Sequence, residues 1–388
     1  MNTKPLTQVC NITTGKLDSN AETPSGKYPF FTCAPEPLKI DTFAFDDDVI
    51  LLAGNNAQGN FHLQRYKGKF NAYQRTYVIT AKAGYDIDYI KYSLELSLQH
   101  LKRIAQGSQT KFLTMQILDS FRVADIPYEY QKSLVGSVRE IDRKISVNSN
   151  ICAKLEAMAK MLYDYWFTQF DFPNADGKPY RSSGGEMVWN DQLKREIPKD
   201  WEVDNLYRIA NFINGLACQK YRPADGERGL PVIKIREMHE GISKDTEQVS
   251  ENIPEKNKIY DGDVLFSWSA TLEVMYWFGG KGGLNQHIFK VSPKVPFTKE
   301  YMYEQLSAYV INFVKMAEAR KTTMGHITTD HLEQSRIVVP PEHIIENFSK
   351  VIAPIHKKLG QCHKENRELT KLRDWLLPIL MNGQATVE

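Results

Sequence analysis

The chain has 388 residues, of which 42% are hydrophobic and 25% are charged, and its formal net charge is +2. This composition is typical of a folded globular protein rather than a disordered one, and the length predicts two or three domains. The near-neutral total charge does not by itself indicate a polyanionic partner. Locally, nine Lys and Arg stand against three Asp and Glu between residues 60 and 111, which predicts either a nucleic-acid-binding surface or an ordinary solvated face.

The N-terminus and the cysteines limit the cellular context. No run of about 18 apolar residues occurs, and Met1–Pro5 has no apolar core, so we expect neither a membrane span nor a signal peptide. The five cysteines are odd in number and form no C-x-x-C pair. They favour reduced thiols in a cytoplasmic protein over a zinc ribbon or a disulfide framework.

The sequence contains one internal repeat. Pro5–Gly15 (PLTQVCNITTG) matches Asn205–Gly215 (NLYRIANFING) at Leu, aliphatic, Asn and Gly positions. Further matches follow in the same order: Phe45–Leu51 with Tyr260–Phe266, Tyr73–Arg75 with Asn285–His287, Phe112–Thr114 with His326–Thr328, and Ile126–Pro127 with Val339–Pro340. Matches in one order indicate a duplicated unit, and the second copy has about a dozen extra residues before Asp263.

Each copy predicts strands, then a helix, then a short closing strand. The expected elements are strands Val49–Leu52 and Tyr77–Thr80, helix Tyr85–Ala105 and strand Arg122–Ile126 in the first copy, and strands Val264–Phe266 and His287–Val291, helix Lys299–Lys321 and strand Arg336–Val339 in the second. Between the copies, Asp171–Asp200 is rich in turn formers. We expect a linker with little regular structure there, which Trp189 and Trp201 fasten to a neighbouring surface.

A long helix with a narrow apolar seam follows each copy. Apolar residues recur at alternating steps of four and three from Leu134 to Trp166 and again from Ile345 to Leu376, a spacing that favours coiled-coil pairing. Pro354 lies inside the second seam, where its missing amide should kink or break the helix.

The polar positions of the two seams predict how the helices pair. Aligning the copies places Asn148 on Cys362 and Cys152 on Asn366, so the two residue types are exchanged. An antiparallel pair brings Asn148 to Asn366 and Cys152 to Cys362, and we expect the buried amides to fix the register. The alternative is that each seam packs only on its own domain.

The sequence lacks the usual catalytic motifs. It has no N-P-P-Y or D-P-P-Y methylation segment, no phosphate-binding loop, no G-x-S-x-G elbow and no H-E-x-x-H. The glycines of Gly279–Gly283 lack a strand-then-helix setting and predict a loop tip. His287, His326 and His331 have no accompanying metal-ligand spacing, so they predict ordinary surface or hydrogen-bonded histidines.

Both copies carry polar side chains in matched loops, which are candidates for contacts to DNA. Asn and Gln read adenine edges, Arg and Lys read guanine, and Ser, Thr and Lys hold phosphates, although a solvated loop is the alternative for any one residue. The candidates are Asn55, Gln58, His62, Gln64, Arg65, Lys67, Gln74, Arg75, Ser108 and Lys111 in the first copy, and Ser267, Ser269, Lys281, Asn285, Gln286, His287, Arg320, Lys321 and Thr322 in the second.

The segment between the copies resembles that of a known family. Phe170–Gly185 (FDFPNADGKPYRSSGG) and Arg195–Val203 (REIPKDWEV) look like the spacer of specificity subunits of type I restriction-modification systems, where I-P-x-x-W commonly opens a target-recognition domain. The resemblance covers the whole chain. The first copy departs from the pattern, because it lacks that opening and begins almost at its Leu6–Gly15 motif.

These patterns and the resemblance imply an α+β fold: two α/β target-recognition domains in tandem, each followed by a long helix, the helices pairing as an antiparallel coiled coil in a pseudo-two-fold internal repeat. The expected boundaries are 1–127 for the first recognition domain, 128–168 for the central spacer helix, 169–200 for the linker, 201–340 for the second recognition domain, and 341–388 for the C-terminal spacer helix and tail.

The resemblance implies a non-catalytic subunit that binds double-stranded DNA. Each recognition domain would read one half of a bipartite target, and the helix pair would fix the gap. S-adenosylmethionine, ATP and Mg would belong to partners, namely two modification (methyltransferase) subunits and restriction (translocase/endonuclease) subunits, with no cofactor and no metal in this chain. Two alternatives are a stand-alone DNA methyltransferase or nuclease with degenerate motifs and a two-headed coiled-coil scaffold.

Overall fold

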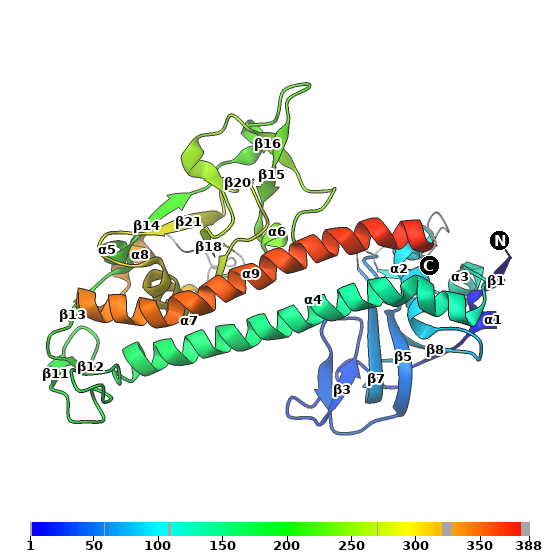
Figure 1. The fold of residues 1–388 in the computed structure, drawn as a ribbon, viewed down its shortest axis with the longest axis horizontal. Coiled ribbons are helices and arrows are strands. Elements are labelled where there is room, and N and C mark those ends of the chain that lie inside the picture. The colour runs from blue at the N-terminus through cyan, green and yellow to red at the C-terminus, as the bar shows by residue number, and fades with distance from the viewer. Residues whose placement is uncertain are drawn as a thin grey trace. The chain divides into compact units, whose positions relative to one another are not determined.

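A computed structural model describes residues 2–57, 59–107, 110–269, 271–319, 327 and 329–381. It divides into two compact units, unit 1 (Met1–Lys144 with Leu369–Glu388) and unit 2 (Ile145–Glu368). Two long helices, α4 (Tyr128–Tyr163) and α9 (Glu342–Met381), each contribute residues to both units (Figure 1). Every helix within the described ranges is too short or too polar to cross a membrane.

Unit 1 is built around a six-stranded sheet. In spatial order its strands are β2 (Cys10–Thr14), β8 (Thr76–Ala81), β5 (Phe45–Ala53), β7 (Leu63–Ala72), β3 (Tyr28–Phe31) and β4 (Leu38–Ile40). Two small ladders accompany it, β1 (Thr3–Pro5) with β10 (Arg122–Ala124) and β6 (Asn55–Asn56) with β9 (Lys111–Phe112). The helices are α1 (Leu6–Val9), α2 (Ile87–Ile104) and α3 (Met115–Ser120).

The central strand β5 is buried on both faces, which explains its continuous apolar run. Ile50 and Leu52 pack with α2, α4 and the end of α9, whereas Val49 and Leu51 pack with Phe70 of β7. Alternate residues of a strand point to opposite faces, so a strand covered on both sides needs apolar residues at every position.

Unit 2 contains two four-stranded sheets. The first runs β14 (Ala210–Asn214), β21 (Ile288–Pro293), β18 (Val264–Ser267) and β19 (Glu273–Tyr276), and the second β16 (Gln248–Ser250), β15 (Gly229–Ile233), β20 (Gly282–Leu284) and β17 (Lys258–Ile259). The ladders β11 (Met187–Asn190) with β12 (Arg195–Pro198) and β13 (Glu202–Asp204) with β22 (Ile337–Val339) complete its strands. Its own helices are α5 (Leu206–Ile209), α6 (Ile235–Glu240), α7 (Lys299–Ala319) and α8 (Thr329–Gln334), with 3-10 turns at Cys218–Lys220 and Glu255–Asn257 and a π-helical turn at Asp164–Thr168.

Equivalent hydrogen bonds in the two units confirm the internal repeat. Gly15 N donates to Thr76 O at 3.3 Å, and Gly215 N donates to Ile288 O at 3.1 Å. The phenol of Tyr89 in α2 donates to Ala124 O at 3.2 Å, and that of Tyr301 in α7 to Val338 O at the same distance. Strands β15 and β16 are the counterparts of β3 and β4, since β15 pairs in parallel with β20 and antiparallel with β16, as β3 does with β7 and β4. The extra residues of the second copy include α6, which lies between β15 and β16.

The antiparallel pairing of the long helices is confirmed within each unit. In unit 2, Trp166, which follows α4, packs on Phe348 of α9 with ring centroids 5.5 Å apart. In unit 1, Leu134 of α4 shares a buried cluster with Leu377 and Leu380 near the other end of α9. The start of one helix therefore meets the end of the other.

Three details differ from the sequence expectations. The linker forms a β-hairpin, β11–β12, whose turn at Asp191–Lys194 is closed by Lys194 in the left-handed region (φ 52°). Trp201 is buried among Phe167, Phe170 and Phe172, as expected, but Trp189 is 60% exposed and belongs to no buried cluster of the described residues. Helix α9 is continuous through Pro354, because that residue is exposed and the carbonyl it frees, four residues earlier, also lies on the solvent side.

Candidate nucleic-acid interface

In unit 1 the turn Tyr73–Arg75 joins β7 to β8 and presents two exposed side chains, Gln74 and Arg75. Its backbone is held from both sides: Gln74 N donates to Leu17 O, and Gly54 N donates to Arg75 O, both at 2.9 Å. A Cβ added to Gly15 would lie 1.9 Å from Ala72 O, and one added to Gly54 would lie 2.3 Å from Arg75 O. Glycine is therefore required at both positions, because any side chain there would collide with the backbone of the turn.

The neighbouring ladder β6–β9 carries two more candidates, Asn55 and Lys111, both half-buried. Lys102, near the end of α2, donates to Asn60 Oδ1 at 2.6 Å, and its side chain and that of Lys111 flank Gly59. Lys102 was not among the sequence candidates. Lys102 lies about 40 residues after this loop, at the end of a helix, so the sequence alone did not indicate that its side chain contacts the loop.

His62 and Gln64 are engaged by the segment before β4. The His62 ring Nε2 lies 3.0 Å from Ala34 O, and Gln64 Nε2 donates to Pro35 O at 2.7 Å. Burial lowers the pKa of His62, and the hydrogen bond to Ala34 only partly offsets this. In this conformation both side chains hold the loop that contains Ala34 and Pro35.

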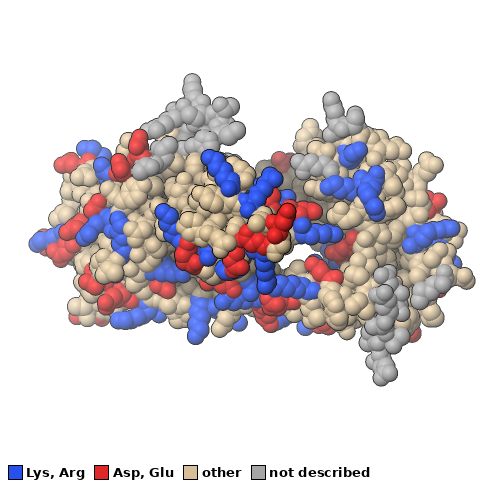
Figure 2. Space-filling view, turned by 90° about the horizontal axis from the view of Figure 1, so that it is seen from above, with Lys and Arg blue, Asp and Glu red and all other residues tan. Residues whose placement is uncertain are grey.

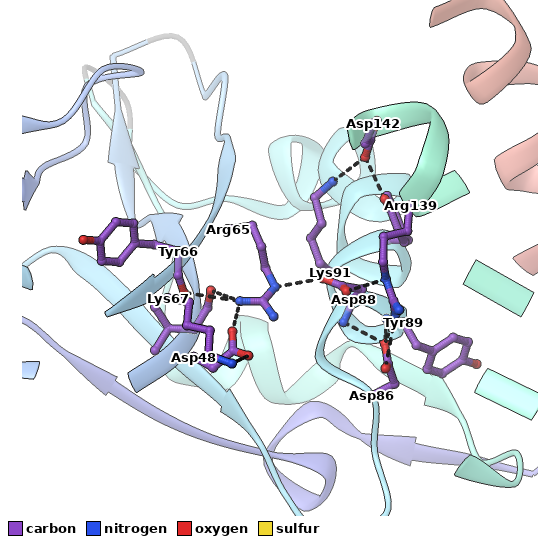
Figure 3. A network of polar contacts seen from close by, with 12 residues as sticks. Asp48, Arg65, Tyr66, Lys67, Asp86, Asp88, Tyr89, Lys91, Arg139 and Asp142 are labelled. Atoms are coloured by element: carbon purple, nitrogen blue, oxygen red, sulfur yellow. Dashed lines mark hydrogen bonds and ion pairs between the residues drawn. The ribbon is translucent and has the colours of Figure 1, made fainter. Parts of the chain in front are cut away.

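Arg65 lies in a network of ion pairs (Figure 3). Its guanidinium binds Asp48 and, at 2.8 Å, Asp88, while Arg139 of α4 binds Asp88 from another side, also at 2.8 Å. Burial alone lowers the pKa of Arg65, but the hydrogen bonds to Asp48 and Asp88 outweigh burial and raise it. The network joins β5, β7, α2 and α4, and so fixes the sheet to the long helix.

Part of the local positive charge of unit 1 is thus compensated by acidic side chains. Besides Arg65, Lys91 pairs with Glu95 and Asp142 at 3.0 and 3.2 Å, whereas Lys82 donates to a neutral acceptor, Thr7 O, at 2.6 Å. Lys67, whose side chain is 80% exposed, lies 3.7 Å from Asp48, a surface pair of little strength. Figure 2 likewise shows Lys and Arg interspersed with Asp and Glu over the face it presents.

In unit 2 the segment Asn285–His287 between β20 and β21 occupies the place of Tyr73–Arg75. Gly215 packs on its backbone, since an added Cβ would lie 2.0 Å from Asn285 O. Gln286 Nε2 lies 3.2 Å from His287 Nε2, and His287 N donates to Asn285 Oδ1 at 3.3 Å. Both Gln286 and His287 are half-buried, and His287 Nδ1 is buried with no hydrogen-bond partner among the described residues.

Trp268, absent from the sequence candidates, stands at the position of Gly54. Trp268 N donates to His287 O at 3.3 Å, as Gly54 N does to Arg75 O, and its indole lies 5.6 Å from the His287 ring. Ser267 and Ser269 beside it are buried, with Ser267 Oγ donating to Ser269 O at 3.3 Å. Lys281 forms an ion pair with Glu251. Gln58, Ser108, Arg320, Lys321 and Thr322 lie outside the described residues.

The polar residues of the helix seam meet within unit 2. Asn148 Nδ2 donates to Asn366 Oδ1 at 2.9 Å and to Glu365 Oε2 at 2.8 Å, and Asn366 Nδ2 donates to Ile145 O at 3.4 Å. Cys152 and Cys362 are both buried, and burial first, then the neighbouring Cys362 thiol, raise the pKa of Cys152 to about 11. Within the described ranges, no three His, Cys, Asp or Glu side chains form a group that could hold a metal ion.

Comparison with known proteins places these features in context. The model of the family described as "Type I restriction modification DNA specificity domain" matches residues 1–157 and 198–371. The specificity subunit of the type I restriction enzyme MjaIX from Methanocaldococcus jannaschii is 24% identical over 325 residues, which cover 80% of this chain and 72% of that protein. That of HindI from Haemophilus influenzae is 24% identical over 74% of each chain.

Two further matches differ in extent. The EcoDI specificity subunit of Escherichia coli is 33% identical over 203 residues, which are 52% of this chain and only 40% of that protein. The crystal structure of a type I restriction-modification S subunit from M. genitalium superposes with a TM-score of 0.58 at 15% identity, covering 98% of this chain and 95% of the other. This structural likeness supports the two-unit fold.

Proposed function

The chain belongs to the type I restriction modification DNA specificity family and is the non-catalytic DNA specificity subunit of such a system, and from this premise we propose that each unit reads one half of a bipartite DNA target. The family assignment decides against the two alternatives, a stand-alone methyltransferase or nuclease and a coiled-coil scaffold.

The observation that carries the proposal is the matched turn of the two units. Tyr73–Arg75 and Asn285–His287 share equivalent backbone hydrogen bonds, including Thr76 N to Tyr73 O and Ile288 N to Asn285 O. An equivalent glycine, Gly15 or Gly215, packs on the backbone of each turn. A rigid frame that presents a short variable segment suits base reading, because bidentate contacts in the major groove need fixed side-chain origins. Gln and Arg are side chains that make such contacts to adenine and guanine.

The roles of the candidate side chains follow from their environments. Gln74, Arg75, Gln286 and His287 lie in the matched turns and are the proposed base readers. Lys67, Lys102 and Lys111 are proposed to hold phosphates, since they lie on the same unit outside the turn. Arg65, held by Asp48 and Asp88, is proposed to position the sheet rather than to contact DNA.

The long helices are proposed to fix the gap between the two half-sites. α4 and α9 each run without a break through residues of both units, and the Asn148–Asn366 pair opposes slippage because any shift would leave a buried amide unpaired. We further propose a cytoplasmic complex in which two modification subunits bring S-adenosylmethionine and restriction subunits bring ATP- and Mg-dependent translocation and cleavage.

Mapping methylated bases across a genome tests this function. Cells that contain this chain and its modification subunit should methylate a bipartite motif with a gap of constant length, and cells with the modification subunit alone should not. Methylation at one short uninterrupted motif would contradict the proposal.

A further inference from the structure

A cleft of about 240 Å³ lies inside unit 2, among the β11–β12 hairpin, the end of α4, α7 and β22. Its lining includes two arginines, Arg195 and Arg336, two tyrosines, and the amide side chains of Gln305 and Asn312. None of the described residues that line it is an Asp or a Glu. A cleft lined by hydrogen-bond donors and lacking carboxylates has the chemistry to receive an anion.

The guanidinium of Arg195 is half-buried without a compensating acid. Its central carbon lies 4.5 Å from the centroid of the Phe170 ring, and it forms neither an ion pair nor a hydrogen bond with any described residue. Burial lowers the pKa of Arg195, and the nearby positive charge of Arg181 adds to this effect. Withdrawing an unpaired charge from water is costly, so an anion bound beside Arg195 would offset that cost.

Two more donors of the cleft are buried and lack an acceptor. Tyr163 and Gln305 are only 5% and 6% exposed. Gln305 Oε1 accepts from the Tyr301 hydroxyl at 3.2 Å, whereas Gln305 Nε2 and the Tyr163 hydroxyl have no hydrogen-bond partner within the described ranges. Burial raises the pKa of Tyr163, so its hydroxyl stays protonated and able to donate. Buried polar groups are nearly always hydrogen-bonded, so these two donors indicate an acceptor supplied by a ligand.

The carboxylates near Tyr163 are engaged elsewhere. Glu304 and Asp164 both raise the pKa of Tyr163 further, but Glu304 lies 2.7 Å from His356 and Asp164 lies 2.6 Å from Lys160. Neither carboxylate lines the cleft. The cleft therefore keeps its excess of donors.

The equivalent place in unit 1 does not repeat these donors. Gln305 corresponds to Ser93, whose hydroxyl donates to Tyr89 O of its own helix at 2.8 Å. Tyr163 corresponds to Leu377, an apolar residue of the buried cluster of unit 1. The duplicated frame can thus be built without the two donors, so we attribute them to a property of unit 2 alone.

We propose that this cleft binds the phosphate group of a small molecule, with Arg195, Tyr163 and Gln305 as the donors. A guanidinium binds two phosphate oxygens at once, and a hydroxyl and an amide can donate to the others. Arg336 and Asn312 are exposed and can donate from the edge of the cleft.

The size and the surroundings of the cleft favour a small ligand over a nucleic-acid strand. Its volume of about 240 Å³ lies below that of a typical drug-sized pocket. No residue of the reading turn Asn285–His287 lines it. The inference goes beyond the proposed function and does not rest on it, because every residue that it uses belongs to unit 2.

Isothermal titration calorimetry of the full chain at constant ionic strength tests the proposal, with inorganic phosphate and adenosine monophosphate as probes. One phosphate group should bind per chain, with a dissociation constant of about 1 mM or lower. Tighter binding of adenosine monophosphate would assign the site to a phosphorylated organic molecule, and tighter binding of inorganic phosphate would assign it to the free anion. No saturable binding of either probe would overturn the inference.

Two substitutions identify the site. Arg195→Met keeps an apolar stem on Phe170 and removes the charge, so phosphate should bind at least about tenfold more weakly. Tyr163→Phe removes only the hydroxyl and should weaken binding about two- to tenfold. Neither change should lower the thermal midpoint of the free chain, because each removes a polar group that lacks a partner there. A lower midpoint with unchanged phosphate affinity would show a purely structural role and overturn the inference.

Arg208→Met is the matched control. Arg208 also lies over a phenylalanine ring of unit 2, 5.8 Å from the centroid of Phe297, but it already has an acid, Asp204, at 3.8 Å. This variant should bind phosphate as the unaltered chain does. An equal loss of affinity in Arg208→Met would reduce the effect to general charge attraction and overturn the inference. Displacement of bound phosphate by a DNA duplex would also overturn it, because the cleft would then belong to the nucleic-acid interface.

Discussion

The two units hold the same turn with the same backbone bonds but fill the space beside it differently. Leu113 N donates to Gly54 O at 2.8 Å in unit 1, and Ile327 N donates to Trp268 O at 3.0 Å in unit 2. Unit 1 has no room for a side chain at Gly54, whereas unit 2 carries an indole there against His287. The backbone frame of the turn is constant between the units and the side chains beside it are not, which is what the proposed reading of two unlike half-sites requires.

The junction between each unit and its long helix shows the same contrast. In unit 1, Asp142 of α4 accepts from Tyr92 at 2.7 Å and from Lys91 at 3.2 Å. In unit 2 the corresponding residue of α9 is His356, which lies 2.7 Å from Glu304, the counterpart of Tyr92. The carboxylate has moved from the long helix to the shorter one, yet a polar contact joins the same two elements in both units.

The largest expected effect lies at this junction in unit 2. The side chains of His356 and Glu304 are each 7% exposed, so His356→Leu strands a buried carboxylate and should lower the free energy of unfolding by about 3–5 kcal/mol. Asp142→Asn in unit 1 should cost less, because Asp142 is 24% exposed. Urea denaturation followed by tryptophan fluorescence measures both.

A double variant, His356→Leu with Glu304→Leu, is the control for the buried pair. It removes both polar groups and should recover most of the lost stability. An equal cost for Asp142→Asn and His356→Leu would contradict the account, since it would mean that burial does not distinguish the two junctions.

A smaller loss of stability is expected from substituting the glycines that pack on the two turns, Gly15 and Gly215, and it should be equal in the two units. Gly15→Ala and Gly215→Ala each place a Cβ about 2 Å from a backbone oxygen and should cost about 1–3 kcal/mol or more, because backbone cannot move aside cheaply. Gly136→Ala, whose Cβ would meet nothing within 4 Å on α4, should instead stabilise by about 0.5–1 kcal/mol. A change of the same sign in the thermal midpoint of all three variants would contradict the close packing of Gly15 and Gly215 on the turns.

The smallest stability effect concerns the amide pair of buried Asn148 and half-buried Asn366. Asn148→Leu or Asn366→Leu alone should cost about 0.5–1.5 kcal/mol, because each removes the hydrogen bond between the two amides. The remaining amide keeps another partner, Glu365 for Asn148 and Ile145 O for Asn366. The double variant should cost less than the sum of the two, with a coupling of about 0.5–3 kcal/mol in a double-mutant cycle. If the free-energy costs of the two single variants simply add, the two residues do not interact, and their proposed role in fixing the register is contradicted.

Elements with strong periodicity could be predicted from the sequence. The seam of Leu134–Trp166 and that of Ile345–Leu376 gave both long helices and their antiparallel pairing, because a 3-4 spacing and exchanged polar positions are local signals. The outer strands β3 and β4 and the second sheet of unit 2 could not be predicted, since their short segments depend on pairing with distant strands.

The candidate site was less predictable than the fold. Residue type alone suggested Arg65 as a base reader, but its environment is set by Asp48 and Asp88, which come from other elements. Trp268 has no sequence likeness to Gly54, so their equivalence emerges only from shared backbone bonds. The chemistry of a side chain can be read from sequence, whereas its freedom to act depends on neighbours brought by the fold.

The most direct test of the central claim, that each unit reads one half-site, is the methylation motif of turn variants. Arg75→Ala should relax the bases of one half by about 1–3 kcal/mol and leave the other half unchanged, and Gln286→Ala should do the reverse. The gap length should stay constant in both. Relaxation of the same half by both variants, or of both halves by either, would contradict the account.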